Sequence, residues 1–260
     1  MDTRIIALAN QKGGVGKTTT ALNLAAVLAA KGKKVLLVDS DPQSNASSGL
    51  GVRAASGDKN IYNCYIGDKE TADCILPAKQ KNLSVLPGSI DLVGVEVELV
   101  NQDNREKRLK AVLRPVRDQF HYILIDCPPS LGLITINSLT AADSVLIPLQ
   151  CEYFALEGLA LLVQTIRKVK KNLNRELYIE GLLLTMYDRR NRLTHSVASE
   201  IQKHFGDQVY RAVIPRNVRL SESPSHGQTI LEYDAASSGA KAYQQLGAEF
   251  LKRANNRARE

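Results

Sequence analysis

The sequence has no tryptophan and contains only four phenylalanines and nine tyrosines among its 260 residues. This scarcity disfavours proteins that bind single-stranded nucleic acid by stacking bases on aromatic side chains. Cysteine is also rare, and its four positions show neither the C-x-x-C spacing of zinc and redox sites nor the density of a disulfide scaffold. We interpret all four as free thiols; they are Cys64, Cys74, Cys127 and Cys151.

Long apolar segments are missing as well. The longest run, residues 21–30, is interrupted by Asn23 and is much shorter than the roughly 20 residues needed to span a bilayer. The first residues lead directly into a strand-like segment, without the apolar region and cleavage site of a secretory signal. We therefore expect a soluble protein that stays in the cytoplasm and is not bound to a membrane.

The overall composition is that of a globular protein. Hydrophobic residues make up 44% of the chain and charged residues 23%, so the chain can bury a core. We expect one domain over residues 1–260. The net charge is +7, and residues 151–260 carry 17 basic and 12 acidic side chains. This basic half fits a polyanion partner, although composition alone fits a solvated surface equally well.

Short apolar runs alternate with amphipathic segments along the whole chain, which predicts an α/β fold: a mostly parallel, twisted sheet with helices on both faces. The runs are continuous rather than alternating, as in strands that are buried on both faces. Residues 44–60 are rich in serine, glycine and other polar residues, and we expect a mobile switch loop there. The expected strands are residues 5–9, 35–38, 83–86, 122–125, 145–149, 179–184 and 209–214, and the expected helices are residues 18–30, 92–100, 105–117, 156–169, 194–204 and 240–254.

A glycine-rich segment, Gln-Lys-Gly-Gly-Val-Gly-Lys-Thr-Thr-Thr at residues 11–20, connects the first strand to the first helix. Glycines let several backbone N–H groups point at one anion, and the helix adds its positive N-terminal end. Lys17 would reach the β- and γ-phosphates and the Thr18 hydroxyl would reach Mg²⁺. The segment departs from G-x-x-x-x-G-K-[ST] because Gln11 replaces the first glycine, but it has a second lysine, Lys12. The expected nucleotide-binding residues of this loop are Lys12, Gly13, Gly14, Val15, Gly16, Lys17, Thr18 and Thr19.

A dinucleotide-binding turn is the competing interpretation of this segment. Gly14 and Gly16 fit the start of G-x-G-x-x-G, and Asp39 ends the second strand, where a ribose-binding acid belongs. However, Thr19 occupies the third glycine position, and the Gly-Lys-Thr triplet has no role in that motif. We therefore favour a phosphate-binding loop.

Acidic residues end two of the predicted strands. Asp126 follows the apolar run 122–125, which is the arrangement that holds Mg²⁺ through a water molecule beside a phosphate loop. Asp39 and Asp41 close the second strand at the same edge of the sheet, where ligands bind in open α/β folds. Each acid alone could be a helix cap or a solvated loop residue. We interpret Thr18 and Asp126 as the metal-holding residues and Asp39 as a further candidate.

Three of these segments together resemble the ParA/Soj partitioning ATPases, which are P-loop NTPases of the deviant Walker A type. They are residues 12–20, 38–43 (Val-Asp-Ser-Asp-Pro-Gln) and 125–130 (Ile-Asp-Cys-Pro-Pro-Ser). The resemblance continues through residues 185–189 and 214–227 and so covers nearly the whole chain.

The resemblance implies an ATPase in which two monomers enclose two ATP molecules with Mg²⁺. Lys12 of each monomer would reach the phosphates of the other, as an arginine finger does, while Lys17 acts within its own monomer. Asp41 would orient or deprotonate the attacking water. The residues implied to contact adenine are Met186, Pro215 and Asn217.

Members of this family also bind double-stranded DNA without sequence preference as ATP dimers. A ParB-like centromere-binding protein stimulates hydrolysis and releases them, so the resemblance implies association with the nucleoid. Scattered basic side chains that contact phosphates give affinity without base readout. The expected DNA contacts are Arg189, Lys203, Arg211 and Arg219, the last of which matches a DNA-contacting arginine of the family.

Two other classes share parts of this pattern. A MinD-like membrane-surface positioning ATPase has the same loop and Lys12 but needs a C-terminal amphipathic helix, and residues 251–260 contain one large apolar residue. An iron–sulfur carrier needs paired cysteines between subunits, and neither Cys127 nor Cys151 has a suitably spaced partner. We therefore favour the partitioning ATPase. The sequence fits a chromosomal and a plasmid system equally.

Overall fold

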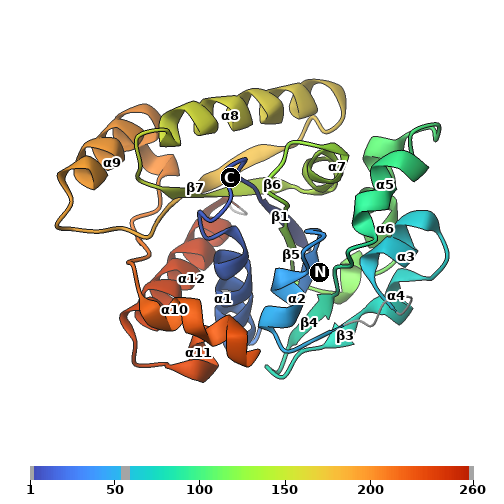
Figure 1. Ribbon diagram of the computed structural model, residues 1–260, viewed down its shortest axis with the longest axis horizontal. Coiled ribbons are helices and arrows are strands. Elements are labelled where there is room, and N and C mark those ends of the chain that lie inside the picture. Colours follow the sequence, from blue (N-terminus) through green and yellow to red (C-terminus); the bar gives the residue numbers. More distant parts are fainter. Residues whose placement is uncertain (1–2, 54–58, 258–260) are drawn as a thin grey trace.

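The computed structural model describes residues 3–53 and 59–257. Over these residues the chain forms a seven-stranded sheet in the order β3-β4-β2-β5-β1-β6-β7 (Figure 1). All neighbouring strands are parallel except for β3, which pairs antiparallel with β4 at one edge. The strands are β1 (Arg4–Leu8), β2 (Val35–Asp39), β3 (Leu76–Pro77), β4 (Leu83–Leu86), β5 (Tyr122–Asp126), β6 (Ser144–Gln150) and β7 (Tyr178–Thr185).

Helices cover both faces of the sheet, as the sequence predicts (Figure 1). One face packs against α1 (Lys17–Ala30), α2 (Asn45–Gly49), α10 (Val218–Glu222), α11 (Ile230–Tyr233) and α12 (Ser238–Arg257). The other packs against α3 (Ile61–Ile66), α4 (Thr71–Cys74), α5 (Leu92–Glu98), α6 (Arg108–Leu113), α7 (Leu133–Ala141), α8 (Ala155–Asn172) and α9 (Arg192–Phe205). Four 3₁₀ turns complete the described chain: η1 (Arg105–Lys107), η2 (Arg117–Gln119), η3 (Gly206–Gln208) and η4 (Ser223–His226).

The continuous apolar strands explain this layering. Successive side chains of a strand point to opposite faces of the sheet. In β1, Ile6 and Leu8 join the core under α1 and α12, whereas Ile5 and Ala7 join the core under α7 and α8. All four are at most 4% exposed. The sheet therefore has two hydrophobic cores.

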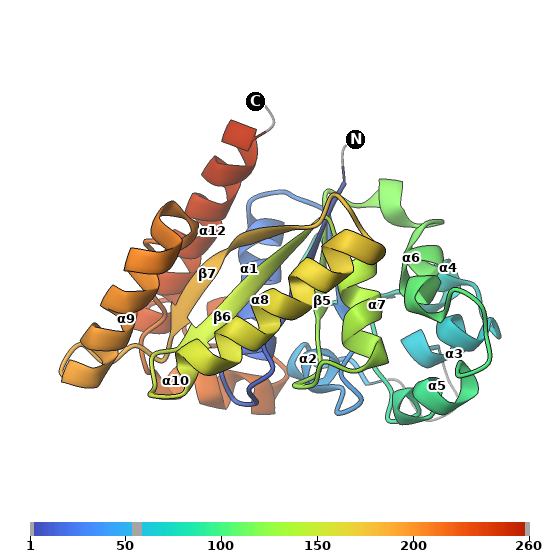
Figure 2. The same ribbon diagram turned by 90° about the horizontal axis from the view of Figure 1, so that it is seen from above.

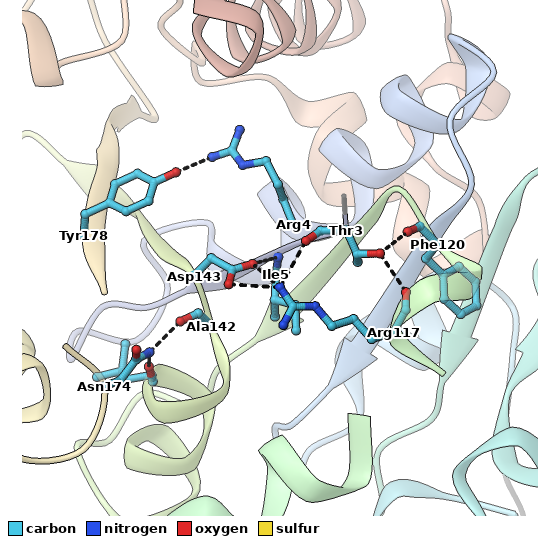
Figure 3. Close-up of polar contacts among 10 residues, drawn as sticks. Thr3, Arg4, Ile5, Arg117, Phe120, Ala142, Asp143, Asn174 and Tyr178 are labelled. Atoms are coloured by element: carbon cyan, nitrogen blue, oxygen red, sulfur yellow. Dashed lines mark hydrogen bonds and ion pairs between the residues drawn. The ribbon is translucent and has the colours of Figure 1, made fainter. Parts of the chain in front are cut away.

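The amino-terminal ends of the strands are tied together by polar contacts (Figure 3). Thr3 donates hydrogen bonds to the carbonyls of Arg117 (2.9 Å) and Phe120 (2.7 Å), and the Asp143 carboxylate accepts one from the backbone of Ile5 at 2.7 Å. These contacts hold one end of the sheet. The opposite, carboxyl end is built from longer loops.

Two sequence predictions about the fold are wrong. Residues 209–214 form no strand, because the segment touches β7 only intermittently: Tyr210 N bonds Leu182 O and Ile214 N bonds Leu184 O. Between these two hydrogen bonds, β7 advances by two residues and the segment by four. The extra residues make the segment bulge, so it forms no regular ladder with β7.

The helix predicted for residues 105–117 is broken. It divides into η1, α6 and η2, and α6 ends at Leu113, two residues before Pro115. Proline has no N–H to donate and its ring disfavours a continuing helix. The other predicted strands and helices are confirmed to within three residues at each end. In the predicted switch region, residues 45–49 form α2, and residues 54–58 lie outside the described part of the chain.

Candidate nucleotide-binding site

The glycine-rich loop connects the carboxyl end of β1 to the first turn of α1. Gly14 (φ 72°) and Gly16 (φ 82°) have left-handed backbone conformations that favour glycine. Thr185, at the end of β7, donates a hydrogen bond to the carbonyl of Val15 at 2.8 Å and so supports the loop from the neighbouring part of the sheet. No side chain caps the N-terminus of α1. Its first N–H groups are therefore available to a phosphate.

The two lysines of the loop lie in different surroundings. Lys17 is buried, lines the cleft and donates a hydrogen bond from Nζ to the carbonyl of Lys12 at 3.0 Å. Burial lowers the pKa of Lys17, and the nearby Asp126 opposes this shift. The Lys12 side chain is exposed and forms an ion pair with Glu152. Lys17 therefore lines the cleft of its own chain, whereas Lys12 lies on the surface beside the cleft.

Asp39 and Asp126 meet at the carboxyl edge, where they are directly opposite in the β2–β5 register. Both are completely buried. Neither carboxylate oxygen of Asp126 has a hydrogen-bond partner among the described residues. Burial raises the pKa of Asp126 well above its ordinary value and the charge of Asp39 raises it further, whereas the nearby Thr18 hydroxyl and Lys17 oppose the shift. A buried carboxylate without partners calls for a cation or a water.

These features fit a Mg²⁺ ion held by Asp126 and the Thr18 hydroxyl. The described residues contain no group of three or more histidines, cysteines or acids that could hold a metal by themselves. Mg²⁺ usually binds through one or two carboxylates, with water and substrate phosphates as the other ligands. The site therefore suits a magnesium–nucleotide complex better than a metal held by protein alone.

Asp39, in contrast, accepts hydrogen bonds at both of its carboxylate oxygens. Its Oδ2 accepts hydrogen bonds from the N–H and hydroxyl of Ser47, at 2.7 and 2.6 Å, and its Oδ1 accepts one from the N–H of Asp41 at 3.3 Å. Burial raises the pKa of Asp39 to about 6, although these hydrogen bonds lower it. In this arrangement the Asp39 carboxylate anchors α2, and Asp41 is the acid of this segment that lines the cleft.

The cleft has a volume of about 1240 Å³ and runs from the glycine-rich loop to residues 214–227. Met186, Pro215 and Asn217, which the resemblance implies as adenine contacts, line it. Asn217 is also the N-cap of α10, where Oδ1 accepts from Leu220 N at 3.3 Å, and its Nδ2 donates to Ser238 Oγ at 2.7 Å. The volume exceeds that of many small-ligand pockets and can accommodate a nucleotide.

Sequence reasoning missed two residues of this region, Glu152 and Thr185. Both follow or end parallel strands at the carboxyl edge, which is the position that singled out Asp39 and Asp126. The same rule, applied to β6 and β7, would have found them.

The predicted DNA-contacting residues do not form one cluster. Arg189 is exposed in the loop after β7, at the carboxyl edge. Arg219, on α10, forms an ion pair with Glu222 (3.0 Å) and lies 3.6 Å from Asp234. Lys203 lies in the last turn of α9, which runs back toward the other end of the sheet (Figure 2). Arg211 is exposed on the irregular segment beside β7.

The chain is similar to known proteins over nearly its whole length. A family model described as an AAA domain matches residues 3–179. The chain is 56% identical over 246 residues to the sporulation initiation inhibitor protein Soj of Bacillus subtilis, covering 95% of this chain and 97% of Soj. It is 54% identical over 250 residues to the chromosome partitioning protein ParA of Myxococcus xanthus, covering 96% of this chain and 88% of ParA. A solved structure of cobyrinic acid a,c-diamide synthase from Mycobacterium smegmatis, with bound ATP analogue and magnesium, superposes with a TM-score of 0.87 at 35% identity and covers 96% of this chain and 95% of its own.

The parallel sheet, the glycine-rich loop between β1 and α1 and the paired acids define a P-loop ATPase of the deviant Walker A type. Within this class, the ParA and Soj relatives are more than 50% identical to this chain over nearly its whole length. The chain belongs to the ParA/Soj family of chromosome partitioning ATPases. None of the helices that the structure describes is long and apolar enough to cross a membrane.

Proposed function

We propose that the chain binds Mg²⁺-ATP in the cleft and that two chains then close on two ATP molecules to form a dimer. The observation that carries this proposal is the different position of the two loop lysines. Lys17 is buried in its own cleft, whereas Lys12 is exposed beside it. A lysine on the surface next to a phosphate loop is placed to reach the nucleotide of a second chain. It would supply positive charge from the open side, as an arginine finger does.

Each remaining site residue then has a role. Lys17 and the loop N–H groups from Gly13 to Thr19 bind the β- and γ-phosphates, Thr18 and Asp126 hold Mg²⁺, with Asp126 acting through a water, and Asp41 orients the attacking water. Met186, Pro215 and Asn217 form the adenine side of the cleft. When bound, Mg²⁺ would neutralise charge on the β- and γ-phosphates. We assign Asp39 the support of α2, because its oxygens already accept hydrogen bonds from Ser47 and Asp41.

The ATP dimer is proposed to bind duplex DNA without sequence preference and to associate with the nucleoid. A ParB-like centromere-binding protein would stimulate hydrolysis and so release the dimer. Exposed Arg189, Lys203 and Arg211 support this role, because Lys and Arg contacts to phosphates give affinity for any sequence. Arg219 contributes less free charge, since Glu222 and Asp234 lie within 4 Å of its guanidinium.

We do not propose the membrane-surface role. A surface-binding helix needs a free apolar face. In α12, Leu246 and Phe250 are completely buried in the core that the helix shares with the sheet, and Ala254 is 8% exposed. The last helix that the structure describes therefore has its apolar face already covered.

One experiment tests the core of the proposal. The molar mass of the wild-type chain is measured with Mg²⁺-ATP, with Mg²⁺-ADP and without nucleotide, each with and without a duplex of arbitrary sequence. We expect a doubling of mass with ATP alone and DNA binding only in that state. A monomer under all conditions, with DNA bound equally in each, would contradict the proposal.

The DNA contact is tested with a matched pair of arginines. Arg189→Ala removes an exposed guanidinium, whereas Arg190→Ala, the control, removes one that is already paired with Asp188 at 3.2 Å. Each phosphate contact contributes about 0.9 to the slope of log affinity against log salt, so the dimer of the Arg189 variant should lose roughly two units of slope. An unchanged slope would remove Arg189 from the DNA interface.

A further inference from the structure

Two adjacent aromatic side chains, Tyr153 and Phe154, are unusually exposed. Their exposed fractions are 75% and 65%, whereas Tyr65, Tyr210 and Phe250 are at most 2% exposed. The two rings contact each other edge to face, with centroids 5.0 Å apart and an interplanar angle of 88°. The other tyrosines and phenylalanines that the structure describes are buried or half-buried. An exposed aromatic pair of this kind marks an interaction site.

The pair is presented by a tight turn between β6 and α8. Backbone hydrogen bonds join Glu152 N to Gln150 O at 2.9 Å and Ala155 N to Glu152 O at 3.0 Å. Cys151 and Ala155, which flank the turn, are 6% and 4% exposed. Because both ends of the turn are packed into the core, the two rings are held outward at low cost in conformational entropy.

The turn lies beside the glycine-rich loop, because Glu152 contacts Lys12. It follows the carboxyl end of β6, at the same edge of the molecule as α2 and α10 (Figure 2). Glu152, the residue before the aromatic pair, forms the ion pair with Lys12. A surface that receives the Lys12 side chain must therefore also meet Tyr153 and Phe154.

We propose that Tyr153 and Phe154 are the apolar anchor on which a second copy of this chain docks. This inference rests on the proposed ATP-dependent dimer and names the surface through which the dimer closes. In a two-fold dimer the same patch appears on both chains, so four rings would be buried around the two nucleotides. Buried aromatic side chains remove large areas from water and often dominate the binding energy of an interface.

The local charge argues against DNA as the occupant. Residues 150–158 contain two acids, Glu152 and Glu157, and no lysine or arginine. A DNA backbone would be repelled by these carboxylates, because its phosphates need cationic partners. A second copy instead brings its own exposed Lys12 to this face of the molecule.

The test compares the double variant Tyr153→Ser/Phe154→Ser with Leu161→Ser, which removes an exposed apolar side chain farther along α8. Dissociation of the Mg²⁺-ATP dimer is measured by sedimentation, and binding of a fluorescent ATP analogue is measured at concentrations where the chain is monomeric. We expect the double variant to dimerise at least about tenfold more weakly, with unchanged nucleotide affinity and unfolding midpoint. Leu161→Ser and the conservative Phe154→Leu should dimerise as the wild type does.

Several results would overturn the inference. If the wild type dimerises with ATP and the double variant does so equally well, the anchor is elsewhere and the proposed function is unaffected. The same conclusion follows if the double variant keeps its dimer but loses DNA binding or stimulation by a partner protein. A wild type that stays monomeric with ATP would overturn the inference and the proposed function together.

Discussion

Asp39 and Asp126 lie directly opposite each other on the adjacent parallel strands β2 and β5, and both carboxyl groups are completely buried. One accepts hydrogen bonds at both oxygens, and the other has no hydrogen-bond partner among the described residues. The two carboxylates therefore have different roles at the same edge of the sheet. Asp39 organises the loop that carries Asp41, and Asp126 is left to meet a cation.

Asp39 makes the stability of the nucleotide-free chain depend on pH. Burial raises its pKa to about 6, whereas an unfolded aspartate has a pKa of about 3.9. Between these values the unfolded chain loses a proton that the folded chain keeps, so this group's contribution falls by about 3 kcal/mol as pH rises from 4 to above 6. Asp39→Asn should lack this fall while keeping an oxygen for Ser47.

The measurement is the free energy of unfolding by denaturant at pH 4.5 and pH 7. The difference between wild type and Asp39→Asn should shift in favour of the variant at the higher pH. Asp118→Asn, at an exposed position, is the control for the loss of one charge. A difference that does not change with pH would argue against a raised pKa for Asp39.

Asp41 is the acid that we expect to control hydrolysis. Asp41→Ala should bind Mg²⁺-ATP and dimerise, because the loop and Asp126 are intact, but it should hydrolyse ATP about 10² to 10⁴ times more slowly. Asp41→Asn keeps an oxygen that can accept the hydrogen bond from Gln43 N, which is 2.9 Å long in the wild type. If the carboxylate acts on water, both variants are slow in single-turnover assays; normal turnover in either would exclude that role.

The two lysines of the loop should fail in different ways. Lys17→Ala should lose nucleotide binding by the monomer, because Lys17 is buried in the cleft of its own chain. Lys12→Ala should bind nucleotide but not dimerise, and its ion pair with Glu152 is too exposed for its loss to affect folding much. Nucleotide affinity and molar mass are measured on both variants. A normal ATP dimer of Lys12→Ala would show that this lysine does not act across an interface.

Close packing of α12 on α1 predicts a large difference between two glycine-to-alanine changes. A Cβ at Gly247 would lie 2.3 Å from Cγ1 of Val27, so Gly247→Ala forces the helices apart and should destabilise the chain by about 1–3 kcal/mol. Gly158, in α8, has open space around its Cβ position, and Gly158→Ala should stabilise by about 0.5–1 kcal/mol. Thermal unfolding of both variants checks the prediction, and equal midpoints would contradict it.

The sequence by itself determined the parts of this protein that depend on neighbours in the chain. Residues 11–20 are contiguous, so the spacing of glycines, lysine and threonine was enough to predict the phosphate loop. Continuous apolar runs were enough to predict strands buried on both faces, because a strand's burial is recorded in its own residues. The rule that parallel strands carry ligands at their carboxyl ends then placed Asp39 and Asp126 at one edge.

Tertiary structure decided whatever depends on partners far along the chain. Lys12 meets Glu152 across 140 residues, and Val15 is supported by Thr185 across 170. Only the fold shows that Asp39 accepts hydrogen bonds at both oxygens, whereas the oxygens of Asp126 have no hydrogen-bond partner among the described residues. It also shows that acidic side chains lie close to Arg219. Residues 209–214 have the composition of a strand, but hydrogen bonding to β7 requires a register that local pattern does not contain. The physical reason is common to all of these cases. The burial, electrostatic environment and hydrogen bonds of a side chain depend on which segments pack against it, and this packing depends on the arrangement of the whole sheet.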